Sequence, residues 1–197
     1  MRKLSLPLGL VLALAPGLAM AHPGAEHVHG AVEGFLHPFG GLDHVLAMVA
    51  VGIFAAQLGG RALWLVPAAF VGTMAAAGAL GMSGVALPHV EIGIALSVVA
   101  LGAAVALNLH IPTSIAAGLA GVFAIFHGYA HGAEMPASLS GLGYATGFIC
   151  ATAILHAIGI GLVVLLTRRE WTASPVAVRV VGGVVAIAGA ALLTGVA

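Results

Sequence analysis

The sequence predicts an all-α integral membrane protein: a bundle of six transmembrane helices that follows a cleaved N-terminal signal peptide. Three observations lead to this prediction. Of the 197 residues, 61% are hydrophobic and only 6% are charged, whereas soluble domains carry roughly 25% charged residues. Six apolar runs are long enough to cross a bilayer as helices, which takes about 20 residues each. No segment shows the alternation of apolar and polar residues that transmembrane strands require.

The first 21 residues have the three parts of a secretory signal peptide. Two basic residues near the start are followed by the apolar run LSLPLGLVLALA and by the small-residue cleavage site Ala19-Met20-Ala21. We expect cleavage to leave His22 as the mature N-terminus, outside the cytoplasm. Residues 22–34 then form a short, polar, histidine-rich leader on that side. An uncleaved signal anchor is the alternative.

The six predicted helices are separated by glycines, prolines or charged residues, which interrupt apolar helical runs. In lipid, a helix satisfies all of its own backbone hydrogen bonds, so helices are the expected spanning elements. We predict the helices near residues 35–58, 61–82, 91–109, 111–133, 141–167 and 175–196, within one permease domain over residues 35–197.

The arginines predict how the bundle is oriented. If His22 lies outside, all four arginines of the mature chain fall at the cytoplasmic ends of the predicted helices, as the positive-inside rule requires. They are Arg61, Arg168, Arg169 and Arg179. We therefore predict a multi-pass protein of the bacterial inner membrane with a periplasmic mature N-terminus.

The segment HPFGGLDHVLAM, residues 37–48, places ionisable side chains in the first predicted helix. On a continuous helix, His37 and His44 are seven residues apart and share one face, and Met48 continues that face one turn deeper. Asp43 points about 100° away, where it can flank the site or reach a neighbouring helix. Ionisable residues inside membranes are rare and usually mark a substrate or ion pathway.

The segment FHGYAHGAEMP supplies a second set at the outer end of the fourth predicted helix. His127, His131 and Glu134 are spaced i, i+4, i+7 and so share one helical face. Glu91 begins the third helix on the same side, and His156 lies deepest, about midway along the fifth. Because imidazole suits nickel, cobalt, copper and zinc, the two sets predict an intramembrane cation site.

The leader repeats this chemistry in water, where its histidines could hold a divalent cation weakly; a merely polar tail is the alternative. The predicted metal ligands are His37, Asp43, His44, His127, His131, Glu134, Met48, His156, His22, His27 and His29.

The H-x5-D-H signature at residues 37–44, the FHGYAHGAEMP segment and the histidine-bearing leader together resemble the HupE/UreJ family. That family comprises hydrogenase- and urease-accessory membrane proteins regarded as nickel or cobalt permeases. The resemblance extends over essentially the whole mature chain. The larger nickel/cobalt permeases use H-x4-D-H, one residue shorter, so their helix count and ligand geometry do not transfer. The positions that match the family's two motifs are His37, Asp43, His44, His127, His131 and Glu134.

We therefore expect a permease that takes up a divalent transition metal for metalloenzyme maturation. Ni²⁺ is the first candidate for this metal and Co²⁺ the second. The same ligands would also serve zinc or copper. No nucleotide-binding P-loop is present in the sequence, so we expect a secondary or passive transporter and no enzyme. The expected partners are the metal ion, the lipid bilayer and downstream metallochaperones or hydrogenase or urease maturation proteins. Neither a prosthetic group nor nucleic acid is expected, and the oligomeric state stays open.

Two alternatives belong to other classes of protein. A b-type haem protein could use two transmembrane histidines as axial ligands. An intramembrane zinc metalloenzyme could use the i, i+4 pair His127 and His131. The intervening Gly-Tyr-Ala lacks the glutamate base of H-E-x-x-H, so Glu134 would have to replace it.

Overall fold

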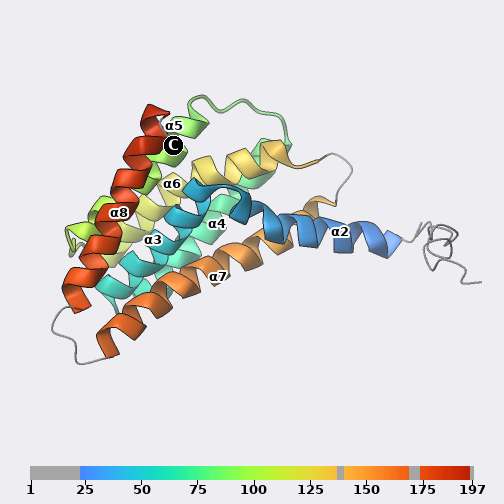
Figure 1. The fold of residues 1–197 in the computed structure, drawn as a ribbon. Coiled ribbons are helices and arrows are strands. Elements are labelled where there is room, and N and C mark those ends of the chain that lie inside the picture. The colour runs from blue at the N-terminus through green and yellow to red at the C-terminus, as the bar shows by residue number, and fades with distance from the viewer. Residues whose placement is uncertain (1–22, 137–139, 169–173, 196–197) are drawn as a thin grey trace, which may run out of the picture.

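A computed structural model describes residues 23–136, 140–168 and 174–195; in these ranges all regular secondary structure is helical, with no strand. The all-α prediction is therefore confirmed for the described residues. The predicted signal peptide and His22 lie outside them. The elements in chain order are α2 (Pro23–Leu36), the 3₁₀ turn η1 (His37–Gly40), α3 (Leu42–Leu58), α4 (Ala62–Met82), α5 (Val90–Ala106), α6 (Thr113–Glu134), α7 (Gly141–Arg168) and α8 (Ser174–Thr194) (Figure 1).

Four of these helices, α4, α6, α7 and α8, are long and apolar enough to cross a bilayer. A fifth span results if the bent stretch from Gly30 to Leu58 is counted as one; α5 is apolar but only 17 residues long. Large apolar side chains such as Leu165 and Ile187 are 68% and 73% exposed on the outside of the bundle, where a membrane protein contacts lipid. The chain is a helical membrane protein with four or five spans by length and composition, and the sixth span remains a prediction.

The predicted continuous helix over residues 35–58 is wrong. The chain is already helical from Pro23, tightens into η1 and bends by 88° before α3 begins at Leu42. Pro38 cannot donate a backbone hydrogen bond, and glycine is a poor helix former, so the sequence His37-Pro-Phe-Gly-Gly41 breaks the helix. His37 and His44 therefore do not share a face of one helix.

The other five predicted helices coincide with α4 to α8 to within three residues at each end. Their bounds follow from local signals, because glycine, proline and charged residues stand at the breaks. The direction in which each helix crosses the bilayer stays a prediction.

The segment expected to be a leader forms most of α2, which packs along the start of α7 (Figure 1). Gly34 lies directly against the backbone of Tyr144, and Gly147 lies against the backbone of Ala31. A side chain at either glycine would force the two helices apart. This close contact holds the chain that leads into η1 against the bundle.

Glycines also let the helices of the bundle approach one another in pairs. On α6, Gly128 lies against the backbone of Met74 and Gly132 against that of Gly78, so α6 packs tightly on α4. Gly52 of α3 meets the carbonyl of His156 in α7 in the same way. Small residues at four-residue spacing allow this backbone contact in membranes. Because α6 is packed on α4 in this way, the face of α6 that carries His127 and His131 is turned toward α3.

Candidate metal centre

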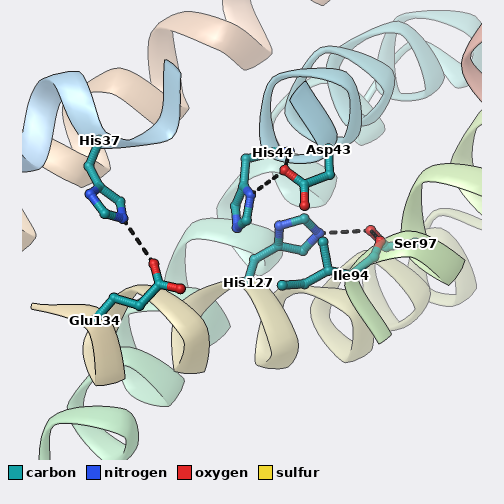
Figure 2. Close-up of polar contacts among 7 residues, drawn as sticks. All are labelled: His37, Asp43, His44, Ile94, Ser97, His127 and Glu134. Atoms are coloured by element: carbon teal, nitrogen blue, oxygen red, sulfur yellow. Dashed lines mark hydrogen bonds and ion pairs between the residues drawn. The ribbon is translucent and has the colours of Figure 1, made fainter. Parts of the chain in front are cut away.

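Three side chains at one end of the bundle lie within reach of a single metal ion. His37 of η1 and His131 and Glu134 of α6 each offer one ligand atom, and these atoms lie within 4.8 Å of one another. The Nε2 atom of His37 is 3.2 Å from Oε2 of Glu134 (Figure 2). The rings of His37 and His131 meet edge to face with centroids 4.7 Å apart. We call these three residues the outer triad.

The outer triad lines an open pocket of about 510 Å³. Its walls come from α2, η1, α3, α5 and α6, and four carboxylates line it: Glu33, Asp43, Glu91 and Glu134. A cleft lined by charges of one sign focuses the field and concentrates counter-ions, so this pocket attracts cations. Glu33 was not among the predicted ligands, because it fell in the expected leader and no spacing linked it to the two histidine segments.

Exposure falls steeply across the outer triad. The side chains of Glu134 and His37 are 57% and 33% exposed, whereas His131 is 5% exposed. Both ring nitrogens of His131 are buried and have no partner among the described residues. His131 therefore carries two uncommitted nitrogens at the point where the open pocket meets the protein interior.

Next to His131, two further histidines form what we call the inner pair: His44 of α3, which also lines the pocket, and His127 of α6. Their rings meet edge to face with centroids 4.6 Å apart, and the His44 ring is 4.2 Å from that of His131. His44 is 8% exposed and His127 is fully buried. The four imidazoles thus form a continuous series of ring contacts, His37 to His131 to His44 to His127, which runs from the pocket wall to the fully buried His127.

Asp43 fixes the orientation of His44. Its Oδ1 atom accepts hydrogen bonds from the backbone N–H of His44 and from Nδ1 of the same residue, both at 2.7 Å (Figure 2). An ionised carboxylate can only accept, so Nδ1 carries the proton and Nε2 keeps its lone pair. That Nε2 is buried without a partner among the described residues. A carboxylate behind an imidazole is the usual arrangement around metal-binding histidines.

His127 also has a polar neighbour, Ser97 of α5, whose Oγ lies 2.7 Å from Nε2 (Figure 2). Sequence reasoning did not single out Ser97, because a serine in an apolar run has no spacing relation to the two histidine segments. The one feature of the sequence that could have indicated Ser97 is that it is a polar residue in the middle of the apolar helix α5.

The two deeper predicted ligands lie in different surroundings. Met48 is fully buried in the apolar core. His156 of α7 is 2% exposed, and both of its ring nitrogens lack a partner among the described residues. The ring of Phe70 lies 5.7 Å from that of His127 and 5.3 Å from that of His156, centroid to centroid. Phe70 therefore contacts both the inner pair and His156.

The predicted ligands of the leader fall outside the side chains that the structure describes. His22 precedes the first described residue, and His27 and His29 belong to the first two turns of α2, where only the helix is described. Their part in metal binding stays a prediction.

Comparison with known proteins agrees with the motifs. A family model described as "HupE / UreJ protein" matches residues 10–192. "Protein HupE" of Rhizobium leguminosarum bv. viciae is 53% identical over 180 residues, which covers 91% of this chain and 92% of that protein. No solved structure matches the chain. The similarity therefore extends over the whole helical bundle, and the resemblance inferred from the two histidine segments is confirmed.

Proposed function

Since the chain belongs to the HupE/UreJ family, we propose that it is an inner-membrane permease that carries Ni²⁺, or Co²⁺ with the same ligands, into the cytoplasm. The metal would serve the maturation of a hydrogenase or urease. Family membership supports metal transport in general. The choice of metal, the direction and the pathway are our proposal, and the site geometry supports the pathway.

The observation that carries the proposal is the position of His131. Its ring touches His37, which lines the open pocket, and His44, which belongs to the inner pair. One buried imidazole with two free nitrogens thus adjoins both an exposed carboxylate cluster and a buried histidine pair. A purely structural histidine in a membrane bundle would be expected to have a hydrogen-bond partner, and His131 has none among the described residues.

In the proposed pathway, the leader histidines and the acidic pocket capture the ion from the periplasm. The outer triad binds it first, with the Glu134 carboxylate offsetting part of the cost of desolvating a dication. The ion then passes by ligand exchange from His131 to His44 and His127. A series of sites, each holding the ion only moderately, allows both entry and release.

Below the inner pair, the path continues past Phe70 to His156. The ring of Phe70 lies between the two histidines in this series of contacts, against His127 on one side and His156 on the other. We propose that movement of the Phe70 ring admits the ion to the inner half of the bundle. Met48 packs in the same core and offers a soft thioether beside this path. Transport would be passive or secondary.

The contacts between imidazoles argue against a b-type haem protein. Two axial histidines must leave room for a macrocycle between their rings. The rings of His44, His127 and His131 instead touch edge to face, with the 4.2 and 4.6 Å centroid distances given above. No observation in the described residues favours the zinc metalloenzyme over the permease.

Radioactive nickel uptake in cells that lack other nickel importers tests the proposal. We expect His44→Ala and His131→Ala to reduce uptake to background at unchanged abundance in the membrane. His110→Ala is the matched control, because His110 is exposed, lies in the loop between α5 and α6 and, among the described residues, bonds only the Asn108 carbonyl, at 2.8 Å. Wild-type uptake in both the His44 and His131 variants would contradict the proposed site.

A further inference from the structure

Ser97 is fully buried in α5, and its hydroxyl makes two short contacts in different directions. Its Oγ lies 2.6 Å from the carbonyl oxygen of Ile94 in the same helix and 2.7 Å from Nε2 of His127 in α6 (Figure 2). A serine in a membrane helix commonly bonds to a carbonyl of the preceding turn. The second contact connects Ser97 to the inner pair.

The two contacts together decide where the protons lie. A hydroxyl has one proton, and a carbonyl oxygen can only accept. Ser97 must therefore donate to the Ile94 carbonyl, and its oxygen must accept from His127. Nε2 of His127 accordingly carries the ring proton, and a neutral imidazole then keeps the lone pair on Nδ1.

The free nitrogen of His127 complements that of His44. Nδ1 of His127 and Nε2 of His44 are both buried and without a partner among the described residues, while the opposite nitrogen of each ring is held by Ser97 or Asp43. The two rings lie 4.6 Å apart, centroid to centroid. Each member of the inner pair is thus anchored on one side and open on the other.

From this geometry we propose that Ser97 is a positioning residue for transport: it fixes the Nε2–H tautomer of His127 and so presents Nδ1 to the cation at the inner pair. The assignment rests on the proposed function. Ser97 supports His127 without charge, whereas Asp43 supports His44 with a carboxylate. The inner pair therefore gains two oriented nitrogens with a carboxylate hydrogen-bonded to one ring and not to the other, which keeps a passing dication from being held too tightly.

The first test uses metal-free, full-length protein with ¹⁵N-labelled histidine in lipid nanodiscs. The His127 signals are identified by their absence in His127→Asn. We expect a protonated, hydrogen-bonded Nε2 and an unprotonated Nδ1 in the wild type. In Ser97→Ala we expect the Nε2 proton signal to move upfield and the two nitrogen shifts to approach each other as tautomers exchange. A protonated Nδ1 in the wild type, or an unchanged Nε2–H signal in Ser97→Ala, would overturn the assignment.

The second test is nickel uptake as a function of nickel concentration. Loss of a hydrogen bond behind a ligating histidine typically weakens metal affinity 10–100-fold, so we expect Ser97→Ala to raise KM about ten-fold and Ser97→Thr, which keeps the hydroxyl, to restore it. Ser83→Ala is the control, because the Ser83 hydroxyl also donates to a backbone carbonyl three residues back, that of Leu80 at 2.7 Å, but is exposed and has no hydrogen bond to a histidine among the described residues. A KM in Ser97→Ala equal to that of the wild type would overturn the proposal.

The two tests separate this inference from the proposed function. If the wild type takes up no nickel, the proposed function fails, while the tautomer of His127 in metal-free protein still decides whether Ser97 positions the ring.

Discussion

The imidazoles of His44 and His131 lie edge to face with ring centroids 4.2 Å apart, although His44 belongs to α3 and His131 to α6. Through this contact the buried inner pair adjoins the outer triad. An ion bound by the outer triad would therefore need only to exchange ligands at His131 to reach His44. In the proposed pathway both clusters hold the ion in turn, so substitutions in either cluster should weaken its binding.

Replacing Glu134 by Gln should weaken capture without slowing later steps. The change removes the charge of a 57% exposed carboxylate while keeping its shape and one acceptor oxygen. Affinity for divalent cations depends strongly on the number of charged ligands, so we expect the KM for nickel uptake to rise about ten-fold, with Vmax little changed. Glu33→Gln removes a carboxylate from the same pocket but outside the outer triad, and should have a smaller effect. An unchanged KM in Glu134→Gln would show that the Glu134 carboxylate does not bind the ion.

Replacing Asp43 by Asn should weaken nickel binding 10–100-fold, the usual effect of losing a carboxylate behind a ligating imidazole. The asparagine keeps one acceptor oxygen for the backbone N–H and Nδ1 of His44 but loses the charge that strengthens both bonds. Titration of nickel into purified protein measures the affinity. Asp43→Glu is the companion variant, because it keeps the charge and displaces it by one methylene. Wild-type affinity in Asp43→Asn would show that the carboxylate has no part in binding.

Replacing Gly128 by Ala should destabilise the bundle, because the new methyl group would meet the backbone of Met74 and push α4 from α6. Overpacking of this kind typically costs about 1–3 kcal/mol. Gly118→Ala in the same helix is the matched control, since nothing lies within 4 Å of a Cβ at that position, and it should be neutral or stabilising by up to about 1 kcal/mol. Thermal unfolding in detergent compares the two. Equal stability of both variants would mean that α4 and α6 do not pack as described.

Replacing His156 by Leu should both raise the thermal stability of the protein and slow transport. His156 is buried with two unpartnered ring nitrogens, and burying an uncompensated polar group costs about 1–3 kcal/mol. An apolar side chain of similar size avoids this cost but offers the ion no ligand. We expect a higher thermal unfolding temperature together with a lower Vmax and an unchanged KM for nickel. A stabilised variant that transports at the wild-type rate would show that His156 is only a core residue.

Much of the site was predictable because its spacing is local. His127, His131 and Glu134 share one face of α6 wherever that helix forms, since the helical repeat alone sets their directions. The residues of the outer triad and the inner pair were all among the ligands predicted from the sequence. The directions of His37 and His44 were not, because the prediction placed these two residues on one helix, and the chain instead bends by 88° between them.

The sequence by itself determined the helical class, the position of five helices and the identity of the histidines and carboxylates near the site. These follow from hydropathy, from helix-breaking residues and from the helical repeat, all of which act over short stretches of chain. Only the tertiary structure decided that Glu33 lines the pocket, that His131 lies with His37 and Glu134, and that Ser97 contacts His127. Each of these contacts joins segments far apart in the chain, and their meeting depends on how closely the glycine-bearing faces let the helices pack.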